Sequence, residues 1–133
     1  MIETGASTGI GGKQYYGYLP NLRDVVVDNF RKSGLAVDNQ RICLHQGLFE
    51  NTLQFAPGSH VALAHIDCDW YDPVRLCLER IYQHLAIGGC MILDDYNDFR
   101  GCRKAADGFL AEKPDLVLVA SAPNAVIRRV RAQ

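Results

Sequence analysis

The sequence predicts an α/β domain with a parallel centre and an antiparallel hairpin at its C-terminal end. Two apolar segments, residues 61–66 and 90–93, are separated by a segment whose apolar residues recur at helical spacing. Strand, helix and strand in this order are typical of a parallel sheet. Two further β-prone segments, residues 116–120 and 125–130, flank Pro123-Asn124 and predict a hairpin. Both apolar strands end in aspartate, at the edge of a parallel sheet where ligands bind.

The segments before residue 61 are less regular. Residues 1–20 are rich in Gly and Tyr without a clear period, which predicts a lead-in loop. Residues 21–33 predict a helix, because apolar residues recur at helical spacing at Leu22, Val25, Val26 and Phe30. Residues 41–45 (RICLH) predict a short strand. The chain therefore divides into a lead-in, residues 1–20, and one domain, residues 21–133.

From residue 61 onward the pattern is clearer. Residues 61–66 are almost wholly apolar, which predicts a central strand buried on both faces. Pro73 opens a predicted helix that runs to residue 85 and is ended by Gly88-Gly89. Residues 90–93 form the second buried strand, and residues 101–112 predict a further helix.

Composition excludes several classes of protein. The 133 residues carry a net charge of −1, so the chain has no basic stripe and nucleic acid is not an expected partner. No apolar stretch approaches the roughly 18 residues of a membrane span. The chain has five cysteines, an odd number that cannot all pair, and no two of them form a CxxC motif. This favours reduced thiols in a cytoplasmic protein.

Acidic residues follow both central strands, in HIDCDWYD at 65–72 and ILDDYNDF at 92–99. Adjacent parallel strands end side by side, so Asp67, Asp94 and Asp95 are expected to converge. Carboxylates this close raise each other's pKa unless a cation compensates, and Mg²⁺ is the hard divalent ion that suits oxygen ligands. The alternative is that these acids cap the following helices, as we expect for Asp72. Asp69 is open to either interpretation.

Other candidate residues carry weaker signals. Gly47-Leu48-Phe49 follows the first predicted strand and either borders an adenine ring or forms an ordinary turn. His65 lies inside a strand, which favours a packed core histidine over a general base. Trp70 and Tyr71 either line a substrate pocket or pack in the interior.

These motifs together resemble the macrocin O-methyltransferase family. The resemblance covers residues 21–109 and is strongest over residues 61–104. It is carried by H-I-D-x-D-x-Y from residue 65, G-G-x-x-I-L-D-D-Y from residue 88 and G-C-R-K-A from residue 101. Members of this family use S-adenosylmethionine (AdoMet) to methylate sugar hydroxyls of antibiotics.

The resemblance implies a Rossmann-like class I methyltransferase sheet and a Mg²⁺ site made by Asp67, Asp94 and Asp95. It also implies a glycosylated small molecule as acceptor, held by its hydroxyls at the metal. Asp67 is then the general base as well as a ligand, because it lies beside the activated hydroxyl. The cofactor would be bordered by Asp67 and by the segment that matches the adenine-binding region, which is Gln46, Gly47 and Leu48.

The family's N-terminal glycine-rich cofactor unit has no counterpart before residue 21, so we expect an incomplete sheet and weak or absent AdoMet binding. The family's first strand pairs with the strand that residues 61–66 match. Without it, that strand would expose an apolar edge. We expect either residues 41–45 to cover this edge or the protein to form a homo-oligomer through it.

Two other functions remain open. TGASTGIG at residues 4–11 resembles the glycine-rich loop of short-chain dehydrogenases, but only three residues precede it and no Tyr-x-x-x-Lys follows. The other alternative is a non-catalytic, oligomeric binding or scaffold protein that keeps the acidic site without the cofactor pocket. Metal binding without AdoMet binding would favour that alternative.

Overall fold

The computed structural model describes residues 20–131. The chain divides into two compact units, Met1–Gln46 and Gly47–Gln133, which are described separately. The glycine-rich segment at residues 4–11 and nearly all of the predicted lead-in lie outside the described residues. Among residues 20–131, the structure has no helix that is both long and apolar enough to cross a membrane.

The first unit contains helix α1, Leu22–Lys32, which confirms the helix predicted for residues 21–33. Its last turn is basic, and Lys32 forms an ion pair of 2.9 Å with Asp28 one turn earlier. Gly34 follows the C-cap residue Ser33, and its φ of 74° lies in the left-handed region that glycine adopts readily.

The strand predicted for residues 41–45 is wrong, because the structure has no strand there. The Asp38 carboxylate accepts hydrogen bonds from the backbone N–H groups of Gln40 at 2.9 Å, Arg41 at 2.8 Å and Ile42 at 3.2 Å. These N–H groups are therefore held in a local turn and are not available to a sheet.

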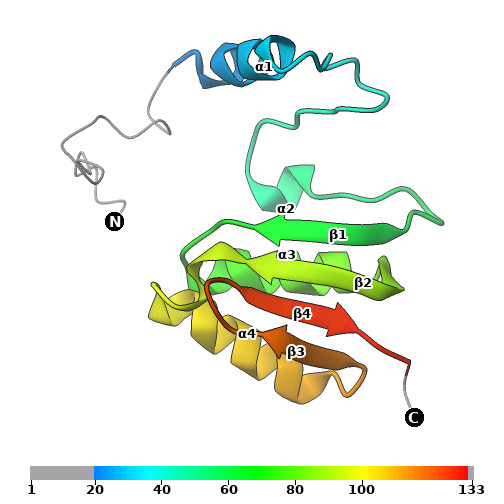
Figure 1. Ribbon diagram of the computed structural model, residues 1–133, viewed down its shortest axis with the longest axis vertical. Helices are drawn as coiled ribbons and strands as arrows, with labels where there is room; N and C mark the ends of the chain where they lie inside the picture. The colour runs from blue at the N-terminus through cyan, green and yellow to red at the C-terminus, as the bar shows by residue number, and fades with distance from the viewer. Residues whose placement is uncertain (1–19, 132–133) are drawn as a thin grey trace. The chain divides into compact units, whose positions relative to one another are not determined.

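The second unit is built on a four-stranded sheet in the order β1-β2-β4-β3 (Figure 1). The strands are β1 Val61–Ile66, β2 Leu85–Leu93, β3 Leu116–Ala120 and β4 Ala125–Arg129. β1 and β2 are parallel, whereas β4 runs antiparallel to both β2 and β3. The predicted parallel pair and C-terminal hairpin are thus confirmed.

Two details of the predicted strands are wrong. β1 lies at an edge of the described sheet and is not buried on both faces, since Leu63 is 63% exposed. β2 begins at Leu85 instead of residue 90, because Gly88-Gly89 lies inside the strand and does not end the helix. The register between β1 and β2 shifts at this point, and a Cβ on Gly89 would lie 3.0 Å from the Val61 carbonyl oxygen.

Helices α3, Tyr71–Tyr82, and α4, Arg100–Glu112, pack together on one face of the sheet (Figure 1). Both were predicted, with ends shifted by a few residues. Two short helices were not predicted: α2 at Phe49–Thr52 and the 3-10 helix η2 at Asp94–Tyr96. The core lies between the sheet and the two long helices, and its largest fully buried side chains are Phe109, Leu78, Leu85, Met91, Leu93, Ile127, Val74 and Cys102.

Candidate functional site

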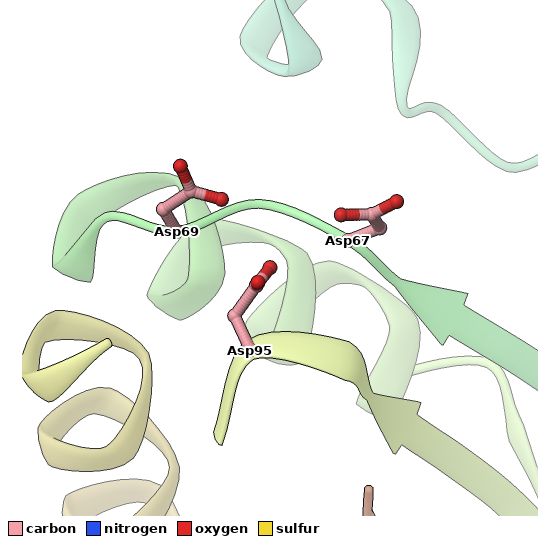
Figure 2. A group of neighbouring side chains, drawn as sticks. All are labelled: Asp67, Asp69 and Asp95. Atoms are coloured by element: carbon pink, nitrogen blue, oxygen red, sulfur yellow. The ribbon is translucent and has the colours of Figure 1, made fainter. Parts of the chain in front are cut away.

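Three carboxylates converge where the parallel strands β1 and β2 end (Figure 2). Asp67 follows β1 directly, Asp69 lies two residues further on, and Asp95 belongs to η2 after β2. One carboxylate oxygen from each residue lies within 4.8 Å of the others. The convergence follows from topology, since adjacent parallel strands bring their carboxyl ends to the same edge of a sheet.

Asp95 is the innermost member of this cluster. It is 9% exposed, and its Oδ2 atom is buried without a hydrogen-bond partner among the described residues. Burial, followed by repulsion from Asp69 and Asp67, raises the pKa of Asp95 to about 6. An unpaired, buried carboxylate oxygen lowers stability. Figure 2 shows the Asp95 side chain pointing toward the space between Asp67 and Asp69. A cation bound among the three residues would supply the missing partner.

Asp94, which the sequence grouped with Asp67 and Asp95, is not among the three acids that converge. Its Oδ1 atom accepts a hydrogen bond of 2.8 Å from the Asn124 side-chain amide and lies 3.5 Å from Nε2 of His65. Asp69 takes the third place in the cluster. Asn124 gives no signal in the sequence, because its contact with Asp94 depends on β4 lying next to β2 in the sheet.

The expectation of a packed core histidine at position 65 is wrong. The His65 side chain is 52% exposed. His65 alternates with the buried Ile66 along β1, so it points away from the core to the face on which Leu63 is also exposed. His65 therefore lies at the surface beside the acidic residues.

The start of α4 packs tightly against the loop that carries Asp69. A Cβ on Gly101 would lie 2.9 Å from the backbone nitrogen of Tyr71 and 3.2 Å from the carbonyl oxygen of Asp69. Gly101 opens the G-C-R-K-A segment, so this motif is explained in part by close backbone packing. Two aromatic side chains near this contact are exposed. Trp70, between Asp69 and Tyr71 in the sequence, is 71% exposed, and Phe99, just before α4, is 41% exposed.

The residues predicted to border the cofactor precede α2. Gln46 ends the first unit, while Gly47 and Leu48 begin the second. Gly47 has a φ of 141°, and Leu48 is 69% exposed at the start of the helix. Their role toward AdoMet stays a prediction.

Comparison with known proteins identifies the family. The family model described as Macrocin-O-methyltransferase (TylF) matches residues 6–115. The chain is 35% identical over 81 residues to an 8-demethyl-8-(2,3-dimethoxy-alpha-L-rhamnosyl)-tetracenomycin-C 4'-O-methyltransferase of Streptomyces olivaceus. It is 32% identical over 84 residues to a demethyldecarbamoylnovobiocin O-methyltransferase of Streptomyces niveus. These matches cover 61% and 63% of this chain but 30% and 31% of the relatives.

Solved structures show the same likeness. The O-methyltransferase NovP superposes with a TM-score of 0.68 at 27% identity, over 81% of this chain and 45% of that one. The apo structure of CalS11, a TDP-rhamnose 3'-O-methyltransferase of calicheamicin biosynthesis, superposes with a TM-score of 0.59 at 27% identity. This match covers 84% of this chain and 52% of the CalS11 chain. The chain thus spans about a third of the length of the curated relatives and about half of the solved chains. With most of its length matched by the family model, the chain belongs to the macrocin O-methyltransferase family.

Proposed function

We propose that this chain carries the acidic, cation-binding part of an AdoMet-dependent O-methyltransferase that acts on a sugar hydroxyl of a glycosylated small molecule. The observation that supports it most strongly is the convergence of Asp67, Asp69 and Asp95, with a buried and unpartnered oxygen on Asp95. The names of the relatives support the reaction class, because they methylate glycosylated natural products or a nucleotide-linked sugar.

The donor set suits a hard divalent cation such as Mg²⁺, since all three side chains are carboxylates. When bound there, Mg²⁺ would polarise an acceptor hydroxyl and lower its pKa. Asp95 would hold the cation from the inner side, because it is the buried member of the cluster.

Asp67 is the general base in this proposal. It is exposed, unlike Asp95, so a carboxylate oxygen is open to solvent and to an acceptor. It would accept the proton of the acceptor hydroxyl, to which AdoMet would supply a methyl group when bound. By the resemblance to the family, Gln46, Gly47 and Leu48 would border the adenine of the cofactor.

The test is methyl transfer by the full chain. Because AdoMet binding by this chain is expected to be weak, the assay uses AdoMet in large excess. Incubation with Mg²⁺ and a panel of rhamnosylated and other glycosylated acceptors should yield S-adenosylhomocysteine and a methylated product, detected by mass spectrometry. Product formation should stop with EDTA, in Asp67→Asn and in Asp95→Asn, and should persist in Asp98→Asn, an exposed neighbour outside the cluster. Methylation that is indifferent to EDTA and to Asp95→Asn would contradict the proposed site.

A second candidate is a non-catalytic, oligomeric binding protein. It is favoured by one observation: β1 forms an edge of the described sheet, and its Leu63 side chain is exposed. An exposed apolar strand edge pairs readily with another chain. Mg²⁺ binding without S-adenosylhomocysteine binding, in a protein that sediments as a dimer or larger, would favour this candidate over the enzyme.

A further inference from the structure

One arginine holds the short helix α2 against α3. Arg80 lies in the last turn of α3 and is half-buried. Its Nη1 atom donates to the carbonyl oxygens of Phe49 at 3.0 Å, Glu50 at 2.8 Å and Leu53 at 3.0 Å. The last carbonyl groups of a helix have no partner inside the helix, and a cation at that end suits the helix dipole. Since a helix of four residues is not stable by itself, α2 depends on contacts such as this one.

α2 in turn fixes the backbone of Gly47 and Leu48. The Leu48 carbonyl oxygen accepts hydrogen bonds from the backbone N–H groups of Asn51 at 2.9 Å and Thr52 at 3.0 Å. It also accepts one of 2.9 Å from the Thr52 hydroxyl, and a Cβ on Gly47 would lie 3.0 Å from the Thr52 methyl group. The Leu48 side chain is 69% exposed, so hydrogen bonds to its backbone, more than packing of its side chain, hold this residue in place.

A second arginine of α3 has different partners. Arg75 donates to the carboxylates of Glu79 in α3 and Glu112 in α4, each at 2.6 Å. Neither acceptor belongs to α2. Arg75 therefore joins α3 to α4, whereas Arg80 joins α3 to α2, so the two arginines separate the stability of the fold from the placement of α2.

We propose that Arg80 is a positioning residue for the cofactor: by holding α2 on α3, it fixes the Gly47–Leu48 backbone that would border the adenine of AdoMet. This inference rests on the proposed function, because that function places the cofactor at this segment. Arg80 itself need not touch the cofactor. Without Arg80, residues 47–53 would have to become ordered when the cofactor binds, and the entropy lost in ordering them lowers the affinity.

S-adenosylhomocysteine is the probe, because it carries the adenine and does not react. In calorimetric titrations of the full chain with the ligand in large excess, Arg80→Ala should raise the Kd by about tenfold. Arg80→Lys should recover most of the lost affinity, because an ammonium group can donate to the same carbonyl oxygens. Arg75→Ala is the matched control: it should lower the thermal midpoint, yet bind S-adenosylhomocysteine as the wild type does.

Hydrogen exchange tests the contact without the cofactor. The backbone N–H groups of Thr52 and Leu53 are hydrogen-bonded in the turn of α2. They should exchange faster in Arg80→Ala than in the wild type, and at the wild-type rate in Arg75→Ala. Mg²⁺ affinity should be the same in both variants and the wild type, because neither arginine belongs to the acidic cluster.

The outcomes separate this inference from the proposed function. A wild-type chain that does not bind S-adenosylhomocysteine would overturn both. Wild-type binding that Arg80→Ala leaves unchanged, or weakens no more than Arg75→Ala does, would overturn only the role given to Arg80. If circular dichroism shows that Arg80→Ala does not fold, Thr52→Val provides the test, because it removes the hydroxyl bond to Leu48. Its Kd should rise by about threefold, and an unchanged Kd would overturn the inference.

Discussion

Two glycines of α4 provide a matched test of how the helix supports the acidic site. A Cβ on Gly101 would lie 2.9 Å from the nitrogen of Tyr71 and 3.2 Å from the oxygen of Asp69, whereas a Cβ on Gly108 would have no neighbour within 4 Å. Both atoms near Gly101 belong to the backbone, so they cannot rotate away from a new methyl group. The loop that carries Asp69 would have to move.

The two substitutions should change the free energy of unfolding in opposite directions. Gly108→Ala should stabilise the protein by about 0.8 kcal/mol, because alanine favours the helix. Gly101→Ala meets an overpacking cost of about 1–3 kcal/mol, which exceeds any gain in helix propensity at this first turn. The two variants should therefore differ by about 2 kcal/mol.

Urea unfolding followed by circular dichroism measures this difference. With a slope of about 1.5 kcal/mol/M, the midpoint of Gly101→Ala should lie about 1 M urea below that of Gly108→Ala. Gly101→Ala should also weaken Mg²⁺ binding, because the displaced loop carries Asp69, while Gly108→Ala should bind as the wild type does. Equal midpoints and equal affinities for the two variants would refute the close packing on which the reasoning depends.

Three further predictions concern other parts of the described unit. The pKa of Asp95 is raised to about 6 from 3.8, so the folded state binds this proton more tightly than the unfolded state does. In metal-free buffer, the stability of the wild type should fall as the pH rises from about 4 through 6, by at most about 3 kcal/mol, and Asp95→Asn should remove this part of the dependence. Phe109→Ala should cost about 3–5 kcal/mol in urea unfolding, because the Phe109 side chain of α4 is fully buried and packs against Tyr82 of α3. A cost below about 1 kcal/mol would contradict that burial. Leu63→Lys should shift any dimer seen by analytical ultracentrifugation toward monomer, since Leu63 lies on the edge strand; an unchanged dimer would exclude β1 as the interface.

Local periodicity explains which elements could be predicted. The apolar spacing of α1 and α3 and the apolar runs of β1 and β2 are properties of neighbouring residues, so the sequence alone indicates them. The turn at residues 41–45 could not be predicted in the same way. There the Asp38 side chain captures three backbone N–H groups, and a β-prone composition gives no hint of it.

The acidic site was predicted in part for a similar reason. Two parallel strands that end in acids predict that Asp67 and Asp95 lie near each other, and the structure places both in the cluster. The distinction between Asp69 and Asp94 depends on rotation within a short 3-10 helix and on Asn124 reaching across from β4. The contact of Asn124 follows from the order of the strands, which the spacing of residues does not contain.

The most direct test of the central claim, that the ends of β1 and β2 form a divalent cation site, is a calorimetric titration of the full chain with Mg²⁺. Wild-type protein and Asp98→Asn should bind with the same affinity, and Asp95→Asn should show no binding heat, because it removes the innermost carboxylate. Binding of Mg²⁺ by Asp95→Asn with wild-type affinity, or no binding by the wild type, would contradict the claim.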